Sequence, residues 1–355
     1  MKLSVLDQSP VLSGKSSAEA MPATIELAQL ADRLGYSRYW LAEHHSSSTP
    51  ADASPEILIP VVAGNTKRIR VGSGGVMLTH YAPLKVAETF RMLATLFPGR
   101  IDMGLGRAPG SDRITAAALQ TGPVSFPIES YPDQVSDVLR FHNNAVPANH
   151  RFSGIHATPV GAETAQPWLL SSSYGSVSYA AALGLPLSFA HFIAESAHSH
   201  LSHGGNAASQ PEFGAGPELV QWYRENFQPS EYFSEAMVSV GVSAVCADTT
   251  DEAKRFGMAR HLMRLRRDQG APLAGVPTLD ELDQLELSEV EQGLISMNRQ
   301  RAIEGDAATV KEKLERLASA YETDELIVLT ITPTYESRAH SYELLADAFN
   351  LGSQG

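Results

Sequence analysis

Short apolar runs alternate with amphipathic segments along most of the chain. Residues 3–9 (LSVLDQS) are typical of a buried strand, and in residues 20–36 the apolar side chains recur at helical spacing until Gly35. The same order is then repeated, a compact strand followed by a helix with an apolar stripe. The strands that this pattern predicts are 3–9, 38–45, 69–78, 100–108, 167–173, 185–190, 236–247 and 324–333.

Eight strand–helix units in one chain predict an α/β fold, a (β/α)8 TIM barrel formed by a single domain over residues 1–355. Parallel strands need crossover helices, and runs such as 326–331 (LIVLTI) are apolar enough to be buried on both faces. A doubly wound sheet is the main alternative. Extra sequence lies at about 109–166, 191–235 and 269–306. Insertions that follow a strand lie at the C-terminal face of a barrel, so we expect them to supply lids and pocket walls.

Composition narrows the functional classes. The 355 residues are 43% hydrophobic, which supports a large core, and no run of eighteen apolar residues or secretory h-region is found. The single cysteine, Cys246, excludes an internal disulfide, so we expect a soluble cytoplasmic protein. A formal net charge of -13 argues against nucleic acid and anionic membranes as partners. An anionic ligand would therefore need a local binding device.

Two predicted strands contain candidate site residues, the second at its end and the third in its middle. The second strand ends in Glu43, His44 and His45, at the position where active-site residues of barrels collect. Polar loop residues are the alternative interpretation of this histidine pair. The third strand contains Gly74 and Gly75, a pair that indicates either a close approach of a ligand to the backbone or packing room in the barrel.

Two further segments favour anion binding. Arg107 stands among glycines in residues 104–112 (GLGRAPGSD), where a guanidinium could hold a phosphate with two bonds. This segment is not a dinucleotide fingerprint, because Pro109 replaces the third glycine and no helix opens directly after it. Ser172, Ser173 and Ser176 stand where the helix after the fifth strand begins, and helix N-termini attract phosphate. Ordinary N-capping would explain one of these serines.

Other chemistries lack support in the sequence. Residues 191–203 contain His191, His198, His200 and His203, but their spacing matches no standard zinc pattern, so we expect a polar lid and no metal. The sequence has no G-x-S-x-G elbow, no P-loop lysine motif and no H-E-x-x-H, so the usual grounds for a hydrolase or a nucleotide-using enzyme are missing.

Taken together, five segments resemble the bacterial luciferase-like flavin-dependent monooxygenases. The likeness extends from residue 3 to about 350 and is densest in the first 110 residues. The resemblance implies an oxidoreductase with a TIM barrel that binds reduced FMN supplied by a separate flavin reductase. Such an enzyme reacts the flavin with O₂ to form a C4a-peroxyflavin and oxygenates a small organic substrate. The segments are YWLAEHH, VGSGGVML, FPGRIDMGLGRAPGSD, SSSYGSVSYAAALGLP and the tail from TDELIVLTIT to SRAHSYELLADAF.

The resemblance also implies roles for individual residues. His44 corresponds to the active-site histidine, where it would act as general acid/base or hydrogen-bond partner, and Glu43 lies near the flavin. Gly74–Gly75 falls where many members have a non-proline cis peptide against the isoalloxazine ring. Arg107 matches the phosphate-binding arginine. The phosphate-binding segment after the fifth strand corresponds to Ser172, Ser173, Tyr174, Gly175 and Ser176.

Some expectations stay open. Ser172–Ser173 stands where luciferase has a Glu-Ser pair, and the aldehyde-pocket residues have no match, so we do not expect light emission. An F420-dependent hydride-transfer oxidoreductase and a non-catalytic flavin-binding protein are the alternative functions. The resemblance suggests a homodimer, whereas neither the substrate nor the role of His45 follows from the sequence.

Overall fold

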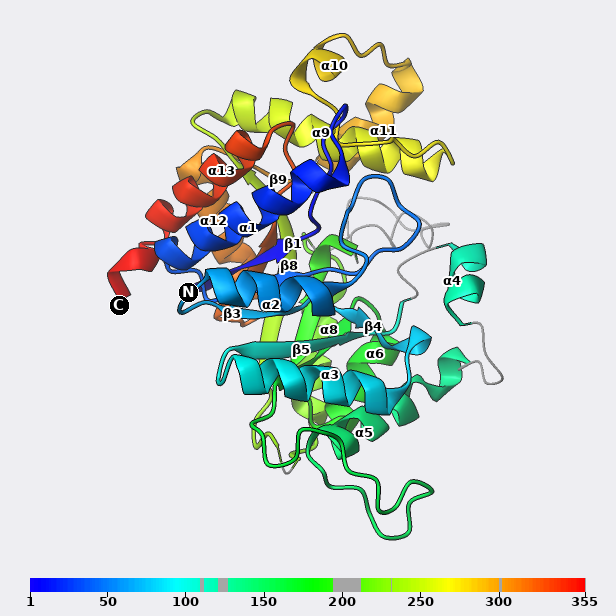
Figure 1. The fold of residues 1–355 in the computed structure, drawn as a ribbon. Coiled ribbons are helices and arrows are strands. Elements are labelled where there is room, and N and C mark those ends of the chain that lie inside the picture. Colours follow the sequence, from blue (N-terminus) through cyan, green and yellow to red (C-terminus); the bar gives the residue numbers. More distant parts are fainter. Residues whose placement is uncertain (109–111, 121–126, 194–211, 231, 300–301, 355) are drawn as a thin grey trace.

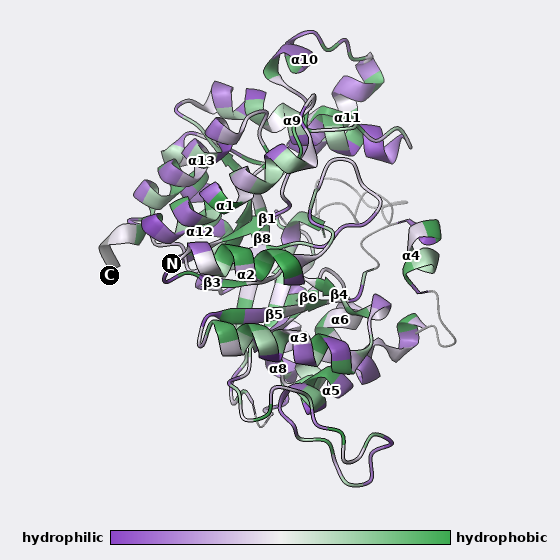
Figure 2. Cartoon of the chain, viewed as in Figure 1, coloured by the Kyte–Doolittle hydropathy of each residue, from purple (hydrophilic) through white to green (hydrophobic). Residues whose placement is uncertain are grey.

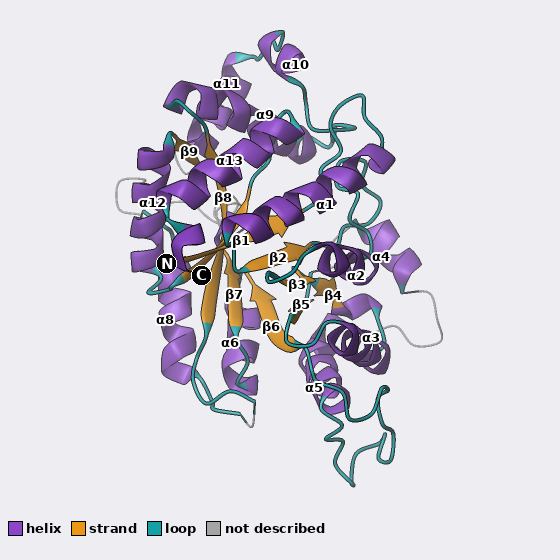
Figure 3. Cartoon of the chain, turned by 60° about the vertical axis from the view of Figure 1, so that its left-hand side comes forward, coloured by secondary structure: helices purple, strands orange, loops and turns teal. Residues whose placement is uncertain are grey.

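A closed barrel of eight parallel strands forms the centre of the molecule, with helices around it (Figure 1, Figure 3). The computed structural model describes residues 1–108, 112–120, 127–193, 212–230, 232–299 and 302–354. The barrel closes because its last strand pairs in parallel with both the first and the seventh, which confirms the predicted (β/α)8 fold. In pairing order the strands are β1 (Lys2–Asp7), β2 (Arg38–Leu41), β3 (Arg70–Ser73), β5 (Ile101–Gly106), β6 (Gln166–Ser171), β7 (Leu187–Ala190), β8 (Val238–Cys246) and β10 (Glu325–Leu329).

Helices follow the strands as the apolar stripes predict. The first of them ends at Leu34 because Gly35 takes a left-handed conformation (φ 89°) that few other residues adopt at low cost. Three helices of this layer, at residues 131–142, 216–226 and 307–320, were not among the predicted units. The helices around the barrel are α1 (Ser17–Leu34), α2 (Pro55–Asn65), α3 (Pro83–Leu96), α5 (Tyr131–His142), α6 (Tyr174–Leu183), α8 (Gly216–Asn226), α9 (Thr250–Asp268), α12 (Ala307–Ala320) and α13 (Tyr335–Ala348).

The blocks of extra sequence contain short elements of their own. Within 109–166 the structure places α4 (Arg113–Leu119), η2 (Ile128–Ser130) and α5, and α5 packs against α3 as part of the helical layer. Within 269–306 lie α10 (Leu279–Asp283), α11 (Glu289–Arg299) and β9 (Ile303–Gly305), which continues the sheet beside the end of β8. A short helix, η4 (Leu351–Gln354), ends the described chain.

The predicted third strand, 69–78, is interrupted. β3 stops at Ser73, the Gly74–Gly75 peptide is cis, and the chain continues as β4 (Val76–Met77) and η1 (Leu78–His80). Both glycines are closely packed, because a Cβ on Gly74 would lie 2.8 Å from Leu6 Cδ1 and one on Gly75 would lie 2.8 Å from the carbonyl oxygen of Gly104. Packing room, one of the two interpretations of this pair, is therefore a real constraint here.

Buried ion pairs fill the barrel at the N-terminal ends of its strands. Asp102, which is fully buried, accepts hydrogen bonds from Arg38 (2.8 Å), from Arg70 (2.6 and 2.9 Å) and from the indole N–H of Trp40 (3.0 Å). Arg38 also donates to Glu325 at 2.8 Å. Two arginines and two carboxylates thus neutralise one another and close the barrel at this end. Among the described residues, no helix has both the length and the hydropathy of a membrane span.

Candidate functional site

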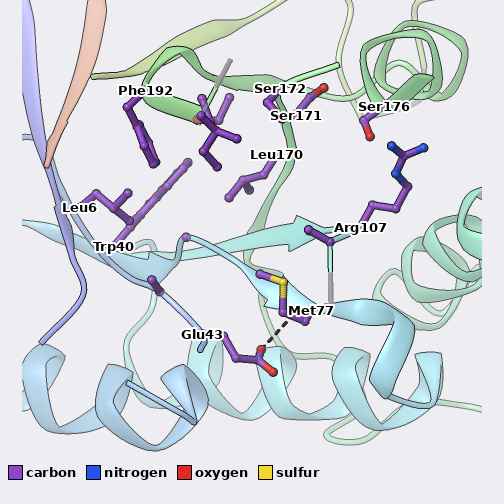
Figure 4. A pocket seen from close by; sticks show the side chains of 18 of the residues that line it. Leu6, Trp40, Glu43, Met77, Arg107, Leu170, Ser171, Ser172, Ser176 and Phe192 are labelled. Carbon is purple, nitrogen blue, oxygen red and sulfur yellow. Dashed lines mark hydrogen bonds between the residues drawn. The ribbon is translucent and has the colours of Figure 1, made fainter. Parts of the chain in front are cut away.

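A cavity of about 520 Å³ opens at the C-terminal ends of the barrel strands (Figure 4). Its size falls in the range of small-molecule and cofactor sites. Much of its lining is apolar, and one end carries an arginine and several serines. The lining residues are Leu6, Gln8, Trp40, Ala42, Glu43, His44, Gly74, Met77, Gly106, Arg107, Ala108, Ile128, Leu170, Ser171, Ser172, Ser173, Ser176, Ser188, Ala190, Phe192, Ile193, Gly241 and Ile327.

Arg107 and the start of α6 form the polar end. Arg107 follows β5, and its Nη2 lies 3.4 Å from Ser173 Oγ, so two segments 66 residues apart in the sequence meet here. Ser173 occupies the N-cap position of α6, but no described side chain caps the helix. The N-capping interpretation of the serines therefore does not describe this helix start. Ser176 is buried in the first turn, and Figure 4 shows its hydroxyl beside Arg107.

The charge of Arg107 is available to a ligand. Within the described part of the chain, no carboxylate lies within ion-pair distance of its guanidinium, in contrast to Arg38 and Arg70. The first N–H groups of α6 and the positive end of its dipole add to this field. An arginine, several hydroxyls and a helix N-terminus therefore converge on one end of the cavity, which is the local device that an acidic protein needs to bind an anion.

Two other residues of the expected phosphate segment have different surroundings. Gly175 lies close to the arginine, since a Cβ at this position would be 3.3 Å from Arg107 Nη1. Tyr174 is 55% exposed and does not line the cavity, and its ring packs on Trp222 with the centroids 5.0 Å apart. Gly175 thus leaves space for the guanidinium of Arg107, and Tyr174 packs toward α8.

Glu43 lines the cavity, but its carboxylate already accepts hydrogen bonds from other groups of the protein. The side chain is buried, and it accepts hydrogen bonds from the Met77 N–H (2.9 Å) and the Tyr81 hydroxyl (2.6 Å). Burial and the bond to Glu43 raise the pKa of Tyr81, so this hydroxyl stays protonated and donates. His45 Nε2 lies 2.7 Å from Glu43 as well, which gives the second histidine a partner. Glu43 therefore anchors the segment that follows the cis Gly74–Gly75 peptide (Figure 4).

His44 is paired with Asp52, a residue that the sequence did not single out. His44 Nδ1 lies 3.1 Å from Asp52 Oδ1, and the His44 side chain is 32% exposed while that of Asp52 is fully buried. An ionised carboxylate only accepts, so Nδ1 carries the proton and Nε2 is the ring nitrogen left for the cavity. Asp52 lies in a run of small polar residues (SSSTPADASP) without periodicity, and no signal in the sequence pointed to it.

The pair has shifted proton affinities. Burial favours the neutral ring of His44, but the hydrogen bond and charge of Asp52 and the charge of Glu43 outweigh it and raise the pKa of His44. Burial also raises the pKa of Asp52 to about 6, although His44 opposes this shift. The pair is therefore an imidazolium and a carboxylate from about pH 6 up to the raised pKa of His44.

Apolar side chains form the other end of the cavity. Figure 4 shows Leu6, Trp40 and Phe192 on the side opposite Arg107, with Leu170 between them. Trp40 and Trp168 pack edge to face inside the barrel, with their ring centroids 5.6 Å apart. An apolar wall excludes water and suits a flat ring or an organic substrate.

The histidines of residues 191–203 do not form a described metal site. His191 is buried, and its Nδ1 lies 2.9 Å from the Tyr321 hydroxyl. His198, His200 and His203 lie outside the described residues. Nowhere in the described ranges do three His, Cys, Asp or Glu side chains gather in a way that could hold a metal ion.

Comparison with known proteins gives the family. A model of the luciferase-like monooxygenases matches residues 1–323. The chain is 42% identical to the uncharacterised protein YwcH of Bacillus subtilis, covering 98% of this chain and 99% of YwcH. It is 30% identical to the N-acetyl-S-alkylcysteine monooxygenase of the same organism, covering 98% of each chain.

Solved structures agree with the fold. Apo-MsnO8 superposes with a TM-score of 0.83 at 34% identity over 99% of this chain and 98% of its own. The oxygenating constituent of 3,6-diketocamphane monooxygenase from Pseudomonas putida, solved in complex with FMN, has a TM-score of 0.66 at 17% identity, over 100% of this chain and 98% of its own, and shows the shared fold alone. The sequence resemblance is thereby confirmed, and the chain belongs to the luciferase-like monooxygenase family.

Proposed function

We propose that this protein is an FMN-dependent monooxygenase that uses reduced FMN and O₂ to oxygenate a small organic substrate. The observation that carries the proposal is one cavity with two chemically different ends. An arginine without a described carboxylate partner lies at one end, and a histidine with a free Nε2 and an apolar wall line the rest. Membership of the luciferase-like monooxygenase family supports the same activity.

The residues fit the proposed cofactor. Arg107, Ser172, Ser173 and Ser176 would hold the phosphate, which is the group that their positive field and hydroxyls favour. The backbone at Gly74, which carries no side chain, would leave room for the flat ring beside the apolar wall. When bound, reduced FMN would supply the electrons that activate O₂. As the family resemblance implies, we propose that a separate flavin reductase delivers the reduced FMN.

His44 would manage a proton at the reacting end. His44 lines the cavity with Nδ1 hydrogen-bonded to Asp52, which leaves Nε2 for proton exchange. The raised pKa of the ring favours its protonated form, so the ring can act as general acid/base. The apolar wall keeps water away, so that the reacting groups exchange protons with Nε2 and not with solvent. Glu43 would act indirectly, because its carboxylate accepts a hydrogen bond from the Met77 N–H and so holds Met77 in the wall of the cavity.

Oxygen uptake tests this function. Purified protein is mixed with FMN, NADH and a flavin reductase, and a panel of thioethers, ketones and terpenes is added with N-acetyl-S-alkylcysteines first. A monooxygenase incorporates one atom of ¹⁸O₂ into a product. His44→Ala should keep FMN affinity within about threefold but lower product formed per O₂ consumed by about 10²-fold or more. His156→Ala, which changes an exposed histidine outside the cavity, should leave both values unchanged.

The same assay separates the competing functions. Selective binding of F420 with hydride transfer and no oxygen uptake would replace the oxygenase with a deazaflavin enzyme. Tight FMN binding with no turnover of any compound would identify a flavin-binding protein. Normal coupling in His44→Ala would remove His44 from the reaction.

We also propose a homodimer formed through α2 and α3. Ile57 and Val61 on α2 and Met92 and Leu96 on α3 are 40–64% exposed and lie on adjoining helix faces. Figure 2 shows α2 as one of the more hydrophobic helices on the surface. The groove beside them is lined by Glu56, Lys85 and Glu88 among others, so a second copy turned by a twofold axis could place Lys85 near a carboxylate.

The mass in solution tests the dimer. Val61→Glu combined with Met92→Glu should convert a species of twice 38.2 kDa into a monomer, because two charges would be buried in the interface. Ile114→Glu changes an 84% exposed residue on α4 and should leave the mass unchanged. A wild-type monomer at micromolar concentration would refute the proposal.

A further inference from the structure

Two neighbouring histidines in this site each pair with a different carboxylate. His45 pairs with Glu43, and His44 pairs with Asp52. Glu43 is fully engaged, because Met77 and Tyr81 also donate to it. Asp52 has His44 as its only side-chain partner among the described residues, and its Oδ2 is buried without any hydrogen bond.

A carboxylate in this condition needs an explanation. Burying an ionised group costs several kcal/mol unless it is paired and hydrogen-bonded. Two other buried carboxylates of the barrel meet this cost with arginines: Asp7 accepts from Arg338, and Asp102 accepts from Arg38 and Arg70. Asp52 is fully buried, and no arginine or lysine of the described ranges forms an ion pair with it, so its compensating charge is the ring of His44.

The backbone holds this pair rigidly. The His44 N–H donates to the carbonyl oxygen of Asp52 at 3.1 Å, so main chain and side chain both join the two residues. The Ala51 N–H donates to the carbonyl of Ser9 (3.1 Å), which fixes the Asp52 segment to the end of β1. The loop that leaves His45 therefore returns to β1 and places a carboxylate behind the imidazole.

We propose that Asp52 is a positioning residue for His44, which holds the ring with Nδ1 protonated and Nε2 directed into the cavity as the site of proton exchange. This inference rests on the proposed function of His44 and extends it. A proton taken from a cavity group would form a bond to Nε2 and give an imidazolium that Asp52 stabilises. The same proton would return to the cavity later in the cycle, so the pair is unchanged overall.

Charged groups around the pair set its proton affinity. Glu43 and His45 follow β2 on the same loop, while Asp7 faces the pair from β1 with Arg338 of α13 bound to it. Glu43 raises the pKa of His44 and Asp7 raises that of Asp52. The charge of Asp52 nevertheless acts on His44 through a direct hydrogen bond, so removal of that charge should dominate the change in His44.

Asp52→Asn tests the inference with the shape of the side chain kept. The amide oxygen can still accept from Nδ1, but the negative charge is lost. The NMR titration midpoint of His44, assigned with His44→Gln in ¹³C-histidine-labelled protein, should fall by about one pH unit or more. The acid limb of the pH profile for product formed per O₂ should move with it, and coupling at pH 7 should drop by at least about tenfold. FMN affinity should stay within about threefold.

A surface pair provides the matched control. His340 and Asp248 form a second His–Asp pair at 2.8 Å, and both side chains are exposed and outside the cavity lining. Asp248→Asn should move the titration of His340 and leave that of His44 and the coupling unchanged. If Asp52→Asn does not fold, the ¹⁵N chemical shifts of His44 in the wild type test the proposal instead. They report the tautomer of the neutral ring, which we expect to carry its proton on Nδ1.

The outcomes separate the two proposals. An unchanged His44 midpoint in Asp52→Asn, or an Nε2–H tautomer in the wild type, would overturn the role of Asp52. A shifted midpoint in a protein that oxygenates no compound would support the pairing and refute the monooxygenase function. A shifted midpoint together with reduced coupling would support both.

Discussion

Removal of the Arg107 guanidinium should weaken FMN binding through the phosphate alone. The side chain lies at the polar end of the cavity beside Ser173, and no described carboxylate neutralises it. A hydrogen bond to a charged group contributes about 1.5–3 kcal/mol. At about 1.4 kcal/mol per factor of ten, Arg107→Ala should raise the Kd of FMN about 10- to 140-fold.

Riboflavin separates this effect from general damage to the cavity. Riboflavin has the same ring and ribityl chain without the phosphate, so Arg107→Ala should change its Kd by less than about threefold. The four dissociation constants, measured by flavin fluorescence for two proteins and two ligands, form a double-mutant cycle whose coupling energy is the phosphate contribution. Arg107→Lys should be intermediate, because an ammonium keeps the charge but loses the two-pronged geometry.

An exposed arginine nearby is the control. Arg113→Ala removes an exposed positive charge from α4, outside the cavity lining, and should leave both constants unchanged. Equal weakening of FMN and riboflavin in Arg107→Ala would show that the arginine shapes the cavity and does not bind phosphate. No weakening of either would move the phosphate site elsewhere.

Two further predictions concern the barrel itself, and urea unfolding measures both. Asp102→Ala leaves the buried Arg38 and the half-buried Arg70 without their shared carboxylate and should lower the free energy of unfolding by about 3–5 kcal/mol. Asp324→Ala breaks an exposed pair with a lysine and should lower the free energy of unfolding by less than about 1 kcal/mol. Equal effects would refute the structural role of Asp102. Gly104→Ala places a Cβ 2.1 Å from the carbonyl oxygen of Ser73 and should destabilise the protein by about 1–3 kcal/mol. Gly293→Ala adds a Cβ in open space within α11 and should stabilise the protein by about 0.5–1 kcal/mol. Loss of stability in both glycine variants would contradict this view of the packing.

The fold followed from the sequence because its signal is repeated. Each buried strand and amphipathic helix of the barrel is a local pattern, and eight such units leave few ways to close a sheet. The apolar pattern did not predict the break at Gly74–Gly75, since Val76 and Met77 are apolar and continue the strand pattern, although the resemblance implied the cis peptide that stands there. The packing against Leu6 and Gly104, which are distant in the sequence, is one reason why glycines stand there.

The site was predicted in its parts but not in its connections. Arg107 and the serines after β6 were recognised separately, and the structure brings Arg107 and Ser173 together. Glu43 was expected beside the flavin, and its bonds to Met77 and Tyr81 could not be foreseen because they depend on the path of the chain after the cis peptide. Asp52 was missed for a similar reason, since its place behind His44 depends on how a loop without periodicity returns to β1.

The distribution of paired and unpaired charge supports a division of the barrel into scaffold and site. Arg38, Arg70 and Arg338 are held by buried carboxylates, so their charges are cancelled within the protein and contribute little field to a ligand. Arg107 is at the cavity and has no such partner among the described residues. In a chain with a net charge of -13, an anion would be attracted only where a positive charge is left uncancelled and water is partly excluded. Under the proposed function, the phosphate of FMN would therefore bind beside Arg107, and the rest of the molecule would extend along the apolar wall toward His44.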